Sequence, residues 1–88
     1  MSHHTDNHLR DACQAALNVF KSINQPEFAE IQSKLEFCIG SYDFDHNPVG
    51  LVEFGKNALE QLNAFKKTNP RKVNKSVIEN LSRSLSER

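Results

Sequence analysis

Residues 28–42 read FAEIQSKLEFCIGSY and contain the most regular helical pattern in the chain. Its apolar residues recur at alternating intervals of three and four, the spacing that places side chains on one face of an α-helix. They are Phe28, Ile31, Leu35, Cys38 and Tyr42. Pro26 suits the first turn of a helix, where its missing N–H would have no partner anyway. We predict a helix from Pro26 to Ile39 or Ser41, ended by Gly40. Phe37 lies off the stripe and is expected to face a different neighbour.

Three further segments have helical periodicity, and none shows the sustained alternation of a β-strand. The first runs from about Asp6 to Ser22. The third follows Asn47 and Pro48, an N-cap and first-turn pair, and extends to about Lys67. Asn74 is expected to cap the fourth. Their apolar stripes are Leu9, Cys13, Ala16 and Phe20; Leu51, Phe54 or Gly55, Ala58, Leu62 and Phe65; and Val77, Ile78, Leu81 and Leu85.

Four helices with short connections predict an all-α fold, a small up-down-up-down antiparallel four-helix bundle. The main alternative is a three-helix core whose fourth helix packs loosely or is lent to a partner subunit. We expect residues 1–5 to be a flexible segment and residues 6–88 to form a single helical domain. Phe20, Leu35 and Leu62 are central on three stripes and are expected in the core.

Composition favours an ordinary globular chain, with 38% hydrophobic and 25% charged residues among 88. No apolar run approaches the roughly 18 residues of a membrane span. The N-terminus lacks the basic and apolar regions of a secretory signal. We therefore expect no membrane association and a cytoplasmic location, where Cys13 and Cys38 would be reduced, buried thiols.

The charge is unevenly distributed along the chain, although the total is zero. Residues 1–60 carry nine acids and four bases, whereas residues 61–88 carry seven bases and two acids. Five bases lie in the ten-residue segment 66–75, which forms one predicted turn and its flanks, and no acid lies among them. They are Lys66, Lys67, Arg71, Lys72 and Lys75. This basic turn is a weak candidate site for an anion or a partner, and nucleic acid is a possible but less favoured ligand.

Motifs for catalysis or for cofactor binding are not found in this sequence. We expect no enzyme activity, no cofactor and no metal site. The bundle topology would gather His3, His4 and His8 with Asp43, Asp45 and His46 at one end, but a solvated polar end is the favoured interpretation. The calcium-loop pattern that begins at Asp43 fails, because Pro48 replaces the required glycine and Phe54 the required glutamate.

These features favour a small helical protein–protein interaction module or regulatory subunit, expected to self-associate. The prediction depends on the thin core of a short chain, the missing catalytic motifs and the dipolar charge. The alternative is an anion or nucleic-acid binder that uses the basic turn at residues 66–75.

Overall fold

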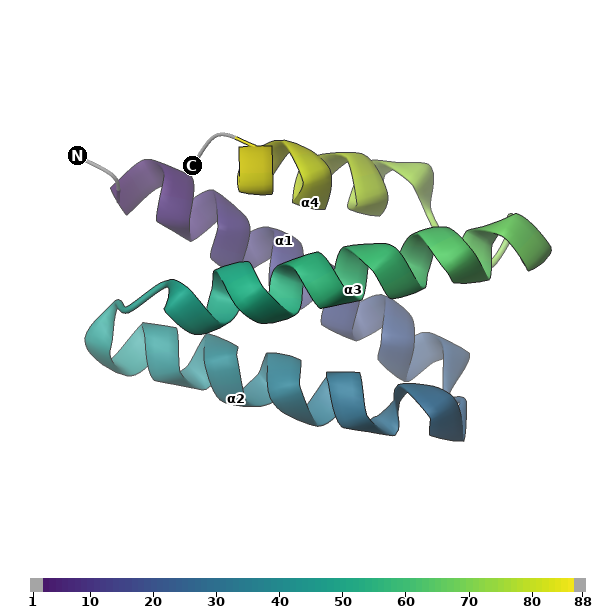
Figure 1. Ribbon diagram of the computed structural model, residues 1–88, viewed down its shortest axis with the longest axis horizontal. Coiled ribbons are helices and arrows are strands. Elements are labelled where there is room, and N and C mark those ends of the chain that lie inside the picture. Colours follow the sequence, from purple (N-terminus) through teal and green to yellow (C-terminus); the bar gives the residue numbers. More distant parts are fainter. Residues whose placement is uncertain (1–2, 87–88) are drawn as a thin grey trace.

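The computed structural model describes the backbone of residues 3–86 and the side chains of residues 7–86. This part of the chain is helical and contains no strand (Figure 1). Its elements are α1 (His3–Ile23), the short 3-10 helix η1 (Pro26–Phe28), α2 (Ala29–Asp45), α3 (Val49–Thr68) and α4 (Lys75–Ser86).

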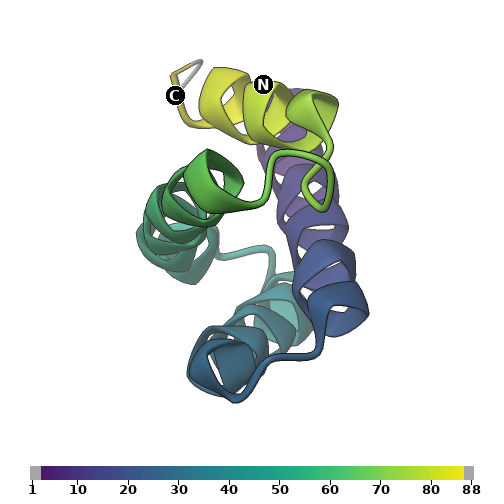
Figure 2. The same cartoon turned by 90° about the vertical axis from the view of Figure 1, so that its right-hand side faces the viewer.

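The four helices run alternately up and down, as the short connections predict. Seen end-on, they occupy the corners of a quadrilateral in the order α1, α2, α3, α4 (Figure 2). Each helix packs against its two neighbours in this order, and α1 also contacts α3 across the middle. Because α4 packs on both α1 and α3, the three-helix alternative is wrong.

The core lies where the four apolar stripes converge. Phe20, Leu35 and Leu62 are fully buried, which confirms their predicted central positions. The ring of Phe28 packs 4.9 Å from that of Phe20 and 5.4 Å, edge to face, from that of Phe65. Aromatic pairs at these distances stabilise a core beyond the area they bury. Leu81 of α4 is also fully buried, so the fourth helix contributes to the same core.

Helix α2 does not end at Gly40, so that prediction is wrong. The helix continues to Asp45 and ends where His46 adopts the left-handed conformation, with φ of 60° and its N–H bonded to the carbonyl of Tyr42. The extra turn buries Tyr42, whose hydroxyl donates a hydrogen bond of 2.9 Å to Oδ1 of Asn7 on α1. This burial stabilises the helix beyond a glycine that would otherwise weaken it.

The other helix boundaries lie close to the predicted boundaries, and local hydrogen bonds accompany them. Helix α1 begins at His3, earlier than the predicted start near Asp6, so the segment assigned to residues 1–5 contributes three residues to the helix. Residues 1–2 lie outside the described part of the chain. Oδ1 of Asn47 accepts a hydrogen bond from the N–H of Val49, and Oδ1 of Asn74 does so from that of Ser76. The predicted cap at Asn74 is therefore confirmed. The prediction for the third helix is wrong by one residue, because Pro48 is the N-cap of α3 and its carbonyl accepts the first helical hydrogen bond, from Val52.

Candidate interaction surfaces

The outward side of α2 carries four exposed residues at intervals of four, three and four. They are Ser33, Phe37, Gly40 and Phe44, and we call them the outer stripe. Phe37 is 74% exposed and Phe44 is 91% exposed, the highest values among the large hydrophobic residues described. Both rings therefore leave most of their apolar surface in contact with water. An exposed apolar patch of this kind is typical of a surface that binds another molecule.

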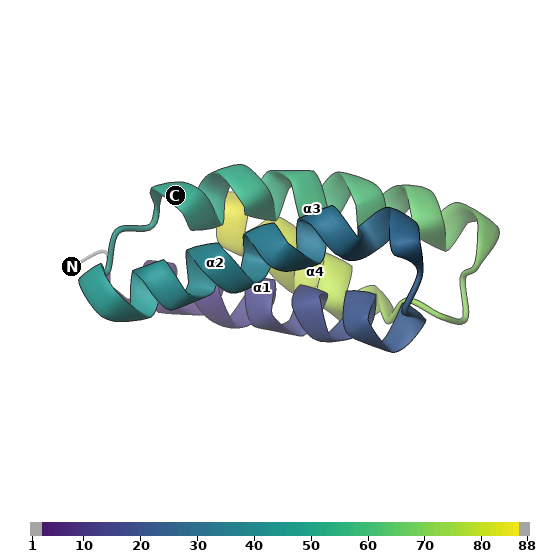
Figure 3. The ribbon, with the colours of Figure 1, turned by 90° about the horizontal axis from the view of Figure 1, so that it is seen from below.

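The outer stripe lies opposite the residues that α2 contributes to the core. Leu35, Cys38 and Tyr42 point into the bundle, whereas Phe37 and Phe44 point away from it. Helix α2 runs along one corner of the bundle, so no other described helix covers its outward side (Figure 3). A helix that is apolar on two opposite sides is typical of one buried on both. In α2, the core covers one of these sides, and no described helix covers the side that carries the outer stripe.

Ion pairs border the outer stripe on the side that faces α1. The guanidinium of Arg10 donates two hydrogen bonds to the carboxylate of Asp43, at 2.9 and 3.1 Å. These hydrogen bonds hold the pKa of Asp43 below its ordinary value. Nζ of Lys21 lies 3.2 Å from the carboxylate of Glu36. Both carboxylates of α2 on this side are therefore matched by a base from α1.

The basic turn lies at the end of the bundle that also holds the connection between α1 and η1 (Figure 3). Lys66 and Lys67 occupy the last turn of α3, and Lys75 begins α4. Arg71 and Lys72 lie in the connection, and all of these side chains except the half-buried Lys66 are exposed. Only Lys75 has a carboxylate nearby among the described residues, that of Glu79 at 3.6 Å. The structure thus places these bases at one end of the bundle.

The opposite end does not gather a metal-binding cluster among the described residues. Asp43 is engaged by Arg10, and Oδ1 of Asp45 accepts the N–H of Asn47. These carboxylates shape the end of α2. The side chains of His3 and His4 lie outside the described residues.

The two cysteine thiols are buried, as predicted, and are not joined to each other. Burial raises the pKa of Cys13 to about 12 and that of Cys38 to about 11. A thiol must lose its proton to act as a nucleophile, so both groups are unreactive near neutral pH.

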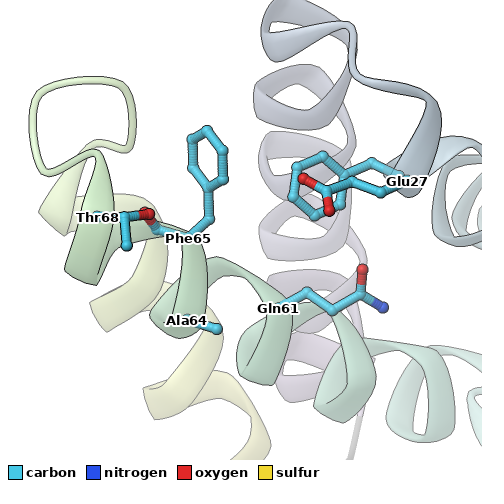
Figure 4. Close-up of a pocket in the computed structure, with 6 residues that line it drawn as sticks. Glu27, Gln61, Ala64, Phe65 and Thr68 are labelled. Atoms are coloured by element: carbon cyan, nitrogen blue, oxygen red, sulfur yellow. The ribbon is translucent and has the colours of Figure 1, made fainter.

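A shallow cavity of about 350 Å³ lies between η1 and the second half of α3 (Figure 4). It is lined by Glu27, Phe28, Gln61, Ala64, Phe65 and Thr68. Glu27 is its only carboxylate, and the hydroxyl of Thr68 donates to the carbonyl of Phe65 in its own helix. The lining therefore offers no pair of groups for acid–base or nucleophilic chemistry.

Three residues of the outer stripe escape the sequence analysis, which singled out only Phe37. Ending the helix at Gly40 placed Phe44 in a loop and hid the regular spacing that joins it to Ser33 and Gly40. The sequence does contain this signal. Once the helix is extended to Asp45, Ser33, Gly40 and Phe44 lie at helical intervals of three or four residues on the same face as Phe37.

Comparison with protein-family models, curated proteins and solved structures gives no match. None of the described helices has both the length and the hydropathy needed to cross a membrane.

Proposed function

We propose that this protein is a helical protein–protein interaction module that binds its partner through the outer stripe of α2. The observation that supports this function is the exposure of Phe37 and Phe44, at 74% and 91%, on the side of α2 opposite the core. If a phenylalanine exposes roughly 200 Å², these fractions leave about 330 Å² of aromatic surface in water. Patches of this size on small proteins are often functional.

The module acts by binding, in this proposal, and does not catalyse a reaction. Its thiols are buried and protonated, and the cavity between η1 and α3 has one carboxylate and no second group that could act with it in acid–base or nucleophilic chemistry. A rigid bundle that presents an apolar helix face is suited to holding another helix.

A comparative pull-down tests the proposal. The bait is the full chain, either unchanged or carrying Phe37→Gln together with Phe44→Gln, which removes aromatic surface without altering charge or helix propensity greatly. Val49→Gln is the matched control, because Val49 is 66% exposed but lies on α3. We expect one protein to be retained by the unchanged chain and by the control, and lost with the double variant.

Purified partner should then bind the unchanged chain directly, with the same loss in the double variant. A partner that binds the double variant equally well would refute the proposal. Circular dichroism of each bait establishes that the bundle is folded.

The basic turn supports a second candidate function, the binding of an anion or a nucleic acid. Lys67, Arg71 and Lys72 are exposed and have no carboxylate partner among the described residues. However, these few bases can engage only about two to four phosphates, and affinity for nucleic acid rises with that number. We expect no tight binding to duplex DNA at about 150 mM salt. Micromolar binding that disappears when all three are replaced by Ala would favour this second function instead.

A further inference from the structure

Small and large side chains alternate along the outer stripe. Ser33 and Gly40 are small, whereas Phe37 and Phe44 are large, and all four are exposed. A Cβ atom added at Gly40 would meet nothing within 4 Å, so the space above this glycine is open. Phe37 and Phe44 are separated by two helical turns, about 10.5 Å along the axis. An open notch therefore lies between two protruding rings.

This order of side chains is complementary to itself when one copy is reversed. In an antiparallel pair of identical helices, any two facing positions exchange between the copies. The register that sets Phe37 against Gly40 of a second copy also sets Gly40 against Phe37 of that copy. The same register sets Phe44 against Ser33. Every large side chain then faces a small one, which is the arrangement that lets packed helices interdigitate.

We propose that the outer stripe binds the outer stripe of a second copy, forming an antiparallel dimer with two-fold symmetry. The inference rests on the proposed function and names its partner. Helix α2 has 17 residues and is about 25 Å long, which is sufficient for two heptads of contact.

The charges beside the outer stripe are compatible with this pairing. Reversing the second copy brings Glu36 near Asp43 of that copy, which would place two acids side by side. Each acid has its own base from α1, because Lys21 pairs with Glu36 and Arg10 pairs with Asp43. The contact therefore brings together equal numbers of acids and bases. By contrast, no large hydrophobic residue is exposed at the basic turn in the described chain. The basic turn of a second copy therefore offers no apolar surface on which Phe37 and Phe44 could pack.

The size of the surface predicts a weak, reversible dimer. About 330 Å² of phenylalanine surface per copy gives about 660 Å² for the pair, before any flanking residues are counted. Interfaces of this area lie at the small end of specific contacts. We expect half of the chains to be paired at roughly 0.1–1 mM.

Sedimentation equilibrium of the full chain from about 10 µM to 2 mM tests the proposal. The mass of the unchanged chain should rise toward that of a dimer. Phe37→Gln with Phe44→Gln should weaken association at least about tenfold, and Val49→Gln should leave it unchanged. A chain that stays monomeric throughout, or a double variant that associates as well as the unchanged chain, would overturn the dimer.

Exchanging the large and small residues tests the register. Gly40→Phe alone should weaken the dimer about tenfold or more, because two rings then meet. Adding Phe37→Ala restores a large residue opposite a small one and should recover most of the association. Stronger association of the Gly40→Phe variant would contradict the antiparallel register. Circular dichroism confirms that each variant folds.

The outcome is separable from that of the proposed function. A monomeric unchanged chain that still captures another protein through Phe37 and Phe44 overturns only the dimer. Association that is abolished by about 1 M salt, or by replacing Lys67, Arg71 and Lys72 with Ala, would show a contact through the basic turn and overturn the proposed interface.

Discussion

Two glycines in helices α2 and α3 should respond oppositely to the same substitution. Gly40 lies inside α2, and a Cβ atom there would meet nothing within 4 Å. Gly50 lies near the start of α3, and a Cβ atom there would lie 3.0 Å from Cβ of Cys38. The structure therefore predicts that Gly40→Ala stabilises the bundle and that Gly50→Ala does not.

The magnitudes follow from helix propensity and packing. Alanine is favoured over glycine by about 0.8–1.0 kcal/mol inside a helix, so Gly40→Ala should raise the free energy of unfolding by about that amount. For a domain of this size, this corresponds to an increase in Tm of roughly 4–8 °C. Overpacking at Gly50 should cost about 1–3 kcal/mol, offset by at most about 1 kcal/mol of helix propensity. The net effect is a loss of up to about 3 kcal/mol.

Urea denaturation followed by circular dichroism measures both effects. Low micromolar protein keeps the chain monomeric, so that contacts between copies do not enter. A Gly40→Ala variant that is no more stable than the unchanged chain would refute the placement of Gly40 in an exposed helix interior. A stabilising Gly50→Ala would refute the close packing of α2 against α3 at Cys38.

Three other predictions concern the core, the thiols and one ion pair. Leu35→Ala should lower the free energy of unfolding by about 2–5 kcal/mol, because Leu35 is fully buried; a loss below about 2 kcal/mol in urea denaturation would contradict this. Cys13 and Cys38 should react slowly with a thiol reagent at pH 8 and rapidly after unfolding, because burial raises both pKa values; fast native labelling would count against their burial. Arg10 lowers the pKa of Asp43 in the folded state, so the stability from this pair is present above the ordinary carboxyl pKa of about 3.9 and is lost as the pH falls through the lowered value. Asp43→Asn should therefore make the free energy of unfolding fall less steeply as the pH is lowered. A variant whose free energy of unfolding depends on pH as in the unchanged chain would contradict the prediction.

The sequence predicts the bundle well, because the fold depends on where apolar side chains recur. The stripe from Phe28 to Tyr42 is buried as predicted, and Asn74 caps the fourth helix as predicted. These features are local, so a single chain contains all the information that determines them. The packing of α4 onto the bundle also follows from its apolar stripe, in which Leu81 is fully buried.

Tertiary packing outweighs local propensity at the end of α2, and there the structure differs from the prediction. A glycine late in a helix commonly marks its end, and Gly40 has this position. Burial of Tyr42 and its hydrogen bond to Asn7 instead extend α2 by another turn. The hydrogen bond is not visible in the local sequence, because Asn7 lies on a different helix. Missing that turn left Phe44 in a loop and the outer stripe unrecognised.

Site-specific photo-crosslinking in the cell tests whether the outer stripe of α2 is the interaction surface. Replacing Phe37 with the photoreactive amino acid benzoylphenylalanine preserves an aromatic side chain at the proposed contact, and the same amino acid at Lys67 probes the basic turn. We expect a discrete adduct from position 37, either with a second copy or with one partner protein, and no comparable adduct from position 67. Adducts that form only from position 67, or none from position 37, would contradict the claim that the outer stripe of α2 is the interaction surface.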